Sequence, residues 1–117
     1  MTPTMLIVDD HAGFRARARS LLEGEGFDVV AEAESGARAL ELAAETEVDV
    51  VLLDVQLPDL DGFEVARRLS ANGDPPAVVL VSSRDASDYG ELIEGCGARG
   101  FVPKAELTGE AVRALLR

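Results

Sequence analysis

The sequence has little of several residues on which other classes of protein depend. Cys96 is the only cysteine among 117 residues, which excludes an internal disulfide and a metal site built from several cysteines. Basic residues are also scarce. The chain has 11 of them and 22 acidic residues, which gives a formal net charge of −11. This charge argues against direct binding to nucleic acid or to an anionic membrane, and it favours a site that gathers cations.

Long hydrophobic runs are also missing. No apolar run exceeds about five residues, whereas a membrane-spanning helix needs about 20. Residues 1–4 carry no basic side chain and precede only a short apolar run, so they do not resemble a secretory signal. We therefore expect a cytoplasmic protein with one domain over residues 1–117, a length sufficient to bury a single core.

Five short apolar runs predict the strands of a buried sheet. They are rich in valine, leucine and isoleucine and do not alternate with polar residues, as is typical of parallel strands covered on both faces. The runs are Met5–Val8, Val29–Ala31, Val50–Leu53, Ala77–Val81 and Phe101–Val102.

Residues with helical spacing lie between and after these runs, and each set predicts one buried helix face. The five faces are Phe14, Ala18, Leu21 and Leu22; Ala37, Leu40 and Ala44; Gly62, Val65, Ala66 and Leu69; Tyr89, Leu92, Ile93 and Cys96; and Ala111, Val112 and Leu115. Ser35 and Asp61 stand where helix N-caps are expected. The alternation predicts an α/β fold of five βα units, with helices on both faces of a parallel sheet.

Polar residues with complementary chemistry follow four of the predicted strands. Because the carboxyl ends of parallel strands meet at one edge of a sheet, we expect these side chains to converge. They are Asp9 and Asp10, Asp54, Ser82 and Ser83, and Lys104. Three carboxylates repel one another unless a cation joins them, and oxygen ligands favour Mg²⁺. The set suits phosphoryl transfer onto Asp54.

Each of these residues also has a simpler interpretation. An aspartate after a strand is most often a turn or N-cap residue, a serine pair is common in turns, and a lysine is usually solvated. Their joint position at four strand ends of one α/β chain favours the shared site.

The residues around these positions resemble a receiver domain of a two-component response regulator, over nearly the whole chain. The resemblance rests on Leu6–His11, on Val48–Glu64 with its Asp-x-x-x-Pro-x-x-x-Gly spacing from Asp54 to Gly62, and on Gly97–Lys104. The residues of the first two segments are similar to those of the subfamily whose members carry a helix-turn-helix output domain. The resemblance implies a flavodoxin-like doubly wound sheet in the order 2-1-3-4-5.

The resemblance also implies a role for each matching residue. Asp54 matches the phosphoacceptor, which takes a phosphoryl group from a histidine kinase or a phosphotransfer protein. Asp10 matches a direct Mg²⁺ ligand, Asp9 a ligand that acts mainly through water, and the backbone carbonyl of Gln56 the third protein ligand.

Three further positions match the family's switch. Ser82 matches the hydroxyl that moves toward the phosphoryl group, and Lys104 matches the lysine that pairs with that group. Phe101 matches the aromatic residue that changes rotamer as the hydroxyl moves. Here phenylalanine replaces the more usual tyrosine, so the switch residue has no hydroxyl.

A second departure follows the lysine. Many receivers have a proline there, joined by a cis peptide bond, whereas here Ala105 follows Lys104. A cis bond without proline costs about 3 kcal/mol, so we expect Lys104–Ala105 to be trans or strained.

The predicted function is a phosphorylation-dependent switch that changes the surface of its fourth helix, fifth strand and fifth helix, with no catalytic turnover of a separate substrate. One alternative is an interaction module of the same fold that needs no phosphorylation. A haloacid dehalogenase-type phosphatase is disfavoured because its Asp-x-Asp motif is absent after the first strand. A flavodoxin is disfavoured because Asp9 and Asp10 would repel the flavin phosphate.

The resemblance also implies partners. They are a sensor kinase or phosphotransfer protein, an output domain in a longer chain, and a second copy of the receiver in a phosphorylation-dependent dimer. Because the chain ends within its last predicted helix, it is either a single-domain receiver or part of a longer regulator, and we expect the longer regulator.

Overall fold

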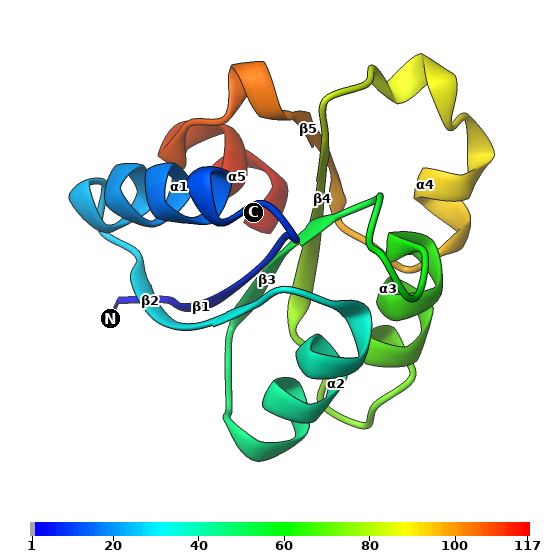
Figure 1. The fold of residues 1–117 in the computed structure, drawn as a ribbon, viewed down its shortest axis with the longest axis horizontal. Helices are drawn as coiled ribbons and strands as arrows, with labels where there is room; N and C mark the ends of the chain where they lie inside the picture. Colours follow the sequence, from blue (N-terminus) through cyan, green and yellow to red (C-terminus); the bar gives the residue numbers. More distant parts are fainter. Residues whose placement is uncertain (1) are drawn as a thin grey trace.

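The computed structural model describes residues 2–117, in which five strands form one parallel sheet (Figure 1). The strands are β1 (Thr4–Val8), β2 (Asp28–Ala33), β3 (Val50–Asp54), β4 (Ala77–Ser82) and β5 (Gly100–Pro103). Their order is β2-β1-β3-β4-β5, and each neighbouring pair is parallel. This confirms the predicted flavodoxin-like, doubly wound sheet.

Helices follow each strand, as predicted. They are α1 (Ala12–Gly24), α2 (Gly36–Glu45), α3 (Gly62–Ser70), α4 (Glu91–Gly95) and α5 (Gly109–Leu116), with short 3₁₀ turns at Ala86–Asp88 and Lys104–Glu106. Within residues 2–117, none of these helices has the length and apolar character needed to cross a lipid bilayer.

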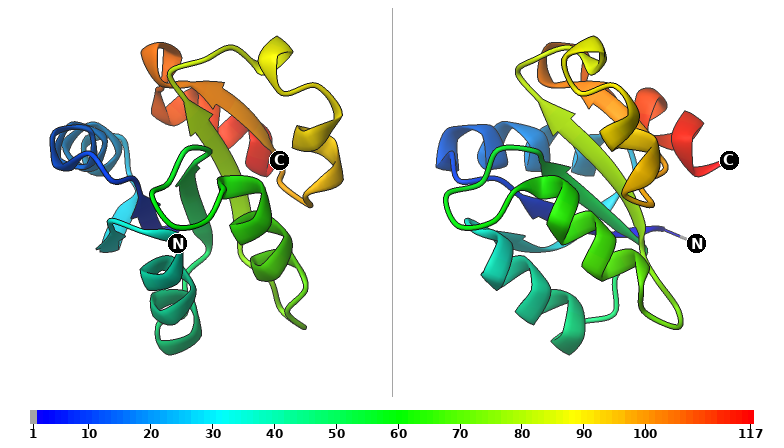
Figure 2. Two further views of the ribbon diagram at one scale, coloured as in Figure 1. Left: turned by 45° about the vertical axis from the view of Figure 1, so that its right-hand side comes forward. Right: turned by 90° about the vertical axis from the view of Figure 1, so that its right-hand side faces the viewer.

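The helices cover the two faces of the sheet in separate groups (Figure 2). On one face, Phe14, Ala18 and Leu22 of α1 and Val112 of α5 pack against side chains of β1, β3 and β4. On the other face, α2, α3 and the end of α4 pack against the alternate side chains of the same strands. Strands β1 and β3 are therefore buried on both faces, which explains why their sequences are continuously apolar.

Two predicted N-caps are confirmed. The side chain of Ser35 accepts a hydrogen bond from the backbone N–H of Arg38, and that of Asp61 accepts one from Glu64. The start of α2 has a second support from the loop after β3. The carboxylate of Asp59 accepts hydrogen bonds from the backbone N–H groups of Gly36 and Ala37 at 2.8 and 2.9 Å.

Two predicted helix faces are partly wrong. Leu21 of α1 is 38% exposed, because the sheet contacts only the narrower stripe of Phe14, Ala18 and Leu22. In α2, Ala37 and Ala44 are exposed. The buried face instead passes through Ala39, with Leu40 and Ala43 partly buried beside it. The helix is thus rotated from the predicted face, with Leu40 common to both.

The fourth helix is shorter than its predicted face implies. It contains only Glu91–Gly95, because Gly90, its N-cap, has a positive φ of +54° and separates the helix from the preceding 3₁₀ turn. Leu92, predicted to face the core, is 51% exposed. Cys96 is buried as predicted, and Ile93 is partly buried.

A close approach joins α3 to the end of β3. A Cβ atom added to Gly62 would lie 2.4 Å from the carbonyl oxygen of Asp54 and 2.7 Å from the Cα atom of Val55. The N–H of Gly62 donates a hydrogen bond of 2.7 Å to the carbonyl of Val55. Glycine at this position therefore allows α3 to begin directly against the strand end that carries Asp54.

Candidate functional site

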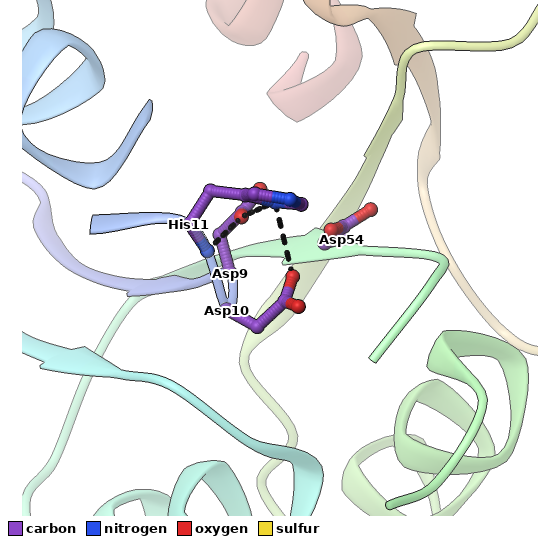
Figure 3. A group of neighbouring side chains, drawn as sticks. All are labelled: Asp9, Asp10, His11 and Asp54. Carbon is purple, nitrogen blue, oxygen red and sulfur yellow. Dashed lines mark hydrogen bonds and ion pairs between the residues drawn. The ribbon is translucent and has the colours of Figure 1, made fainter. Parts of the chain in front are cut away.

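The carboxyl ends of β1, β3, β4 and β5 meet at one edge of the sheet, and the predicted residues lie there. Asp9 and Asp10 follow β1, Asp54 ends β3, Ser82 ends β4 and Lys104 follows β5. Figure 3 shows Asp54 lying across from the three residues that follow β1. Single ligand atoms of Asp9, Asp10, His11 and Asp54 all lie within 4.8 Å of one another. The predicted convergence of the three carboxylates is confirmed.

Asp9 is the most buried carboxylate of the cluster, with no exposed surface. Its Oδ1 accepts a hydrogen bond of 2.8 Å from the backbone N–H of His11. Arg15 of α1 donates to its carbonyl oxygen and also pairs with Glu32 of β2. The backbone of Asp9 is thus tied to both neighbouring elements, which holds its side chain in the cluster.

The second oxygen of Asp9 lacks a well-directed hydrogen bond. Its Oδ2 is buried and has no hydrogen-bond partner of acceptable geometry, although the Lys104 ammonium lies 2.6 Å away. A buried carboxylate oxygen without a directed donor is costly unless a cation compensates it. This oxygen is therefore available to a metal ion or to a metal-bound water.

Asp54 is 3% exposed at the end of β3. Burial raises the pKa of its carboxyl group to about 6, and the negative charge of Asp9 acts in the same direction. The backbone N–H of Gln56 donates a hydrogen bond of 3.1 Å to Oδ1 of Asp54. This hydrogen bond and the positive charge of Lys104 both oppose the rise in the pKa of Asp54. The ionised carboxylate is thus in an unfavourable environment, which an added cation would relieve.

Lys104 supplies the positive charge of the site. Its ammonium lies 2.6 Å from Asp9 and 3.5 Å from Asp54, so it bridges the two buried carboxylates. The same ammonium lies 4.4 Å from the centre of the Phe14 ring on α1, a distance typical of a cation–π contact. No peptide bond within residues 2–117 is cis, so Lys104–Ala105 is trans.

His11 joins the cluster, although the sequence analysis assigned it no role in the site. It is the N-cap of α1, where its side chain makes no capping hydrogen bond. Instead its Nδ1 lies 3.1 Å from a carboxylate oxygen of Asp9 and 3.1 Å from one of Asp10. Dashed lines in Figure 3 mark these contacts. The imidazole is 70% exposed, so it covers the two carboxylates from the solvent side.

Oxygen donors dominate this cluster, and their chemistry fits Mg²⁺. Three carboxylates face one small region, one of them with a buried oxygen that lacks a directed donor. Mg²⁺ takes oxygen ligands and retains several waters, so it needs only a few protein groups. Gln56 is exposed beside the cluster and contacts Asp54 through its N–H group. Its predicted role as a carbonyl ligand stays a prediction.

Ser82 lies at the end of β4 and is 1% exposed. Its hydroxyl forms a hydrogen bond of 2.8 Å with the hydroxyl of Tyr89 and accepts one of 3.1 Å from the backbone N–H of Arg84. Phe101, the predicted switch residue, is partly buried, with its ring centre 5.7 Å from that of Tyr89.

Sequence reasoning missed three contacts in this site. It placed Phe14 and Tyr89 on apolar helix faces, and so did not predict that Phe14 would contact Lys104 or that Tyr89 would bond to Ser82. It also assigned His11 no partner. For Tyr89 a signal was available, because tyrosine has a hydroxyl that usually finds a partner when buried.

Comparison with known proteins identifies the family. A family model described as the response regulator receiver domain matches residues 5–116. The chain is 38% identical over 110 residues to the virulence factors putative positive transcription regulator BvgA of Bordetella pertussis, a match that covers 94% of this chain and 53% of that protein. It is 36% identical over 114 residues to the nitrate/nitrite response regulator protein NarP of Escherichia coli, with the same coverage of 94% and 53%. The chain therefore spans about half the length of the curated relatives it matches.

Solved structures give the same result. The signal receiver domain of the putative response regulator NarL from Mycobacterium tuberculosis superimposes with a TM-score of 0.88 at 34% identity, covering 98% of this chain and 94% of that chain. A LuxR-family two-component response regulator from Aurantimonas also gives 0.88, at 31% identity, covering 99% and 84%. The sheet order, the acidic cluster at the strand ends and these similarities agree, and the chain belongs to the receiver domain family of two-component response regulators.

Proposed function

We propose that this receiver domain is a phosphorylation-dependent signalling switch, in which Asp54 accepts a phosphoryl group from a histidine kinase or a phosphotransfer protein. The observation that carries this proposal is the placement of Asp54, which is buried at a strand end beside a bridging lysine and two further carboxylates. In this proposal the domain is itself the acceptor, and it turns over no separate substrate.

Asp54 would act as the nucleophile. One of its carboxylate oxygens would bond to the phosphorus atom while the bond from phosphorus to the donor imidazole nitrogen breaks, and that nitrogen would keep the electron pair. No general base is needed, because an ionised carboxylate has no proton to lose. Since the pKa of Asp54 is about 6, this carboxylate is ionised in most molecules at neutral pH.

The other residues of the site would bind and orient the incoming group. Asp9, Asp10, Asp54 and the carbonyl of Gln56 would hold Mg²⁺. The ion would supply positive charge between the carboxylates and the phosphoryl oxygens. Lys104 already lies between Asp9 and Asp54 and would pair with a phosphoryl oxygen, while Ser82 would donate its hydroxyl to another.

The signal would then pass to the surface formed by α4, β5 and α5. If Ser82 moves toward the phosphoryl group, the space behind it would be filled by Phe101, whose ring lies on β5. The structure of α4 supports this proposal, because the helix has only five residues and none of them is buried. Such a weakly packed segment needs little free energy to change its position.

The lengths of the relatives support the proposal that this receiver works as part of a longer regulator. Because this chain matches only about half of BvgA and NarP, we propose that it works with an output domain, of the helix-turn-helix type, which would make the DNA contact. The acidic receiver would pair with a cytoplasmic kinase and, once phosphorylated, with a second receiver.

The test is Mg²⁺-dependent labelling with acetyl phosphate, measured by intact mass, with Asp54→Asn as the comparison. We expect one added phosphoryl group that requires Mg²⁺ and is absent from the variant. Labelling that persists in Asp54→Asn would contradict the assignment of Asp54. If the wild-type domain neither gains phosphate nor binds beryllofluoride, the alternative of a phosphorylation-independent interaction module replaces this proposal.

A further inference from the structure

The hydroxyl of Ser82 is already occupied in this structure. A serine hydroxyl has one hydrogen to donate and two lone pairs to accept hydrogen bonds. Ser82 accepts from the N–H of Arg84 and shares a hydrogen bond of 2.8 Å with the phenol of Tyr89. Within the described residues it forms no hydrogen bond with Asp54, although β3 and β4, which carry the two residues, are neighbouring strands.

Tyr89 is anchored by two other aromatic residues. Its ring centre lies 5.4 Å from that of Phe63 on α3, at an interplanar angle of 64°, and 5.7 Å from that of Phe101 on β5. Offset and edge-on contacts of this kind fix the position of a ring. The backbone of Tyr89 ends the 3₁₀ turn Ala86–Asp88, just before Gly90. The phenol therefore joins the Ser82 hydroxyl to the segment between β4 and α4.

From this geometry we propose that Tyr89 is a positioning residue, whose hydroxyl competes with the phosphoryl group for the hydroxyl of Ser82. The inference rests on the proposed function, since it assigns Ser82 a phosphoryl oxygen as its second partner. In the unphosphorylated state Tyr89 holds Ser82. In the phosphorylated state Ser82 leaves Tyr89, and the phenol and its segment lose the contact that held them.

The competition holds for either position of the shared proton. If Ser82 donates to Tyr89, its only hydrogen must turn away before it can donate to a phosphoryl oxygen. If Tyr89 donates to Ser82, movement of Ser82 toward Asp54 lengthens the bond unless the ring follows, and the contact of the ring with Phe63 on α3 opposes that movement. A contact present in only one of two states shifts the equilibrium toward that state. The Tyr89 hydroxyl therefore favours the unphosphorylated state.

The hydrogen bond between Tyr89 and Ser82 connects residues 86–95 directly to the site. Phe101 on β5 has no hydroxyl, so it responds to Ser82 only by filling space. Tyr89 contacts both Ser82 and Phe101, and so both the hydrogen bond and the packing change at one residue. Release of Tyr89 would act directly on residues 86–95, where Gly90 and Gly95 already weaken the helix.

The first experiment measures the affinity of beryllofluoride, a phosphoryl mimic, in saturating Mg²⁺ by calorimetry. Tyr89→Phe removes only the hydroxyl, and we expect it to bind the mimic about 3- to 10-fold more tightly, the range for one lost hydrogen bond. In a Ser82→Ala background the same change should have no effect. Ser70→Ala is the matched control, because it removes a hydroxyl that bonds to the Gly97 carbonyl at the far end of α4.

The second experiment follows Tyr89 itself. The chain contains one tyrosine and no tryptophan, so near-ultraviolet absorbance of the wild-type domain reports this phenol against weak phenylalanine bands. Beryllofluoride with Mg²⁺ should shift the tyrosine band, and Ser82→Ala should shift it in the same direction without the mimic. A band unchanged at saturation would overturn the proposal.

The remaining outcomes separate this inference from the proposed function. Equal or weaker binding of the mimic by Tyr89→Phe, or an equal gain in the Ser82→Ala background, contradicts the role of Tyr89 alone. A wild-type domain that binds no beryllofluoride contradicts the proposed function and this inference with it.

Discussion

The ammonium of Lys104 lies 2.6 Å from Oδ2 of Asp9, closer than its 3.5 Å distance from Asp54. That oxygen has no hydrogen bond of acceptable geometry, so the charge of the nearby lysine is what neutralises the most buried acid of the cluster. It does so at the position where Mg²⁺ is proposed to bind. The charge of Lys104 thus acts on the same carboxylates that would hold the ion.

Replacing Lys104 should therefore destabilise the metal-free domain more than the metal-bound one. We expect Lys104→Met to lower the free energy of unfolding by about 2 kcal/mol in EDTA, because two buried carboxylates lose their cation. Saturating Mg²⁺ should restore part of the loss. Urea unfolding with and without Mg²⁺ measures both values. Arg99→Met is the control, since Arg99 is exposed and forms no ion pair within residues 2–117; an equal loss in the two variants would contradict the prediction.

The stability of the domain should depend on the ionisation of Asp54. The pKa of Asp54 is raised from 3.8 to about 6, so between these values the folded state binds more protons than the unfolded state. Stability therefore falls as the pH rises through this window. A shift of this size corresponds to about 3 kcal/mol, which access of solvent at the site edge reduces to about 1–2 kcal/mol.

Asp54→Asn removes this cost. We expect the variant to be more stable than the wild type by about 1–2 kcal/mol at neutral pH in EDTA, and the gain to vanish near pH 4. Thermal or urea unfolding across this pH range measures the difference. A gain of the same size at both ends of the range would show that ionisation of Asp54 is not its cause.

The contact between α3 and the end of β3 should tolerate no side chain. In Gly62→Ala the added Cβ would meet backbone atoms of Asp54 and Val55, which cannot move without displacing the Asp54 carboxylate. We expect a loss of about 2–4 kcal/mol in unfolding free energy and a large loss of Mg²⁺-dependent labelling. Gly24→Ala at the end of α1, where no atom lies within 4 Å of the new Cβ, should be neutral or slightly stabilising.

Asp59 should hold the first turn of α2. Its carboxylate accepts two backbone N–H groups, and these hydrogen bonds lower its pKa. The bonds persist above its ordinary value of 3.8 and are lost as the pH falls through the lowered value. We expect Asp59→Ala to speed amide hydrogen exchange at Gly36 and Ala37. Ser35→Ala should instead speed exchange at Arg38; exchange that is unchanged at Gly36 in Asp59→Ala would contradict this role.

The fold could be predicted because its central strands, β1, β3 and β4, are buried on both faces. A strand such as β3 must be continuously apolar, and the carboxylate that ends it marks the edge of the sheet, so Asp54 was placed correctly from the sequence. Helix α2 was harder, because it is rich in alanine. Several of its alanines fit a helical period, and only packing against α3 and the sheet selects Ala39 over Ala37 and Ala44.

The finer contacts of the site depended on features that no local pattern records. The partner of Tyr89 is set by where the 3₁₀ turn ends and by the positive φ of Gly90, rather than by helical spacing. The contact of Phe14 with Lys104 joins residues of α1 and of the 3₁₀ turn after β5, which only the assembled fold brings together.

The position of Lys104 has a practical consequence for handling the protein, because it is the only lysine in the chain. Reagents that attach dyes, biotin or a solid support through primary amines can react only with the α-amino group and with this one side chain. A preparation coupled in this way would lose the positive charge between Asp9 and Asp54 in every molecule modified at Lys104. Modification of primary amines would thus remove a charge from the very site under study. The rate at which Lys104 is modified would report how accessible its amine is to the reagent.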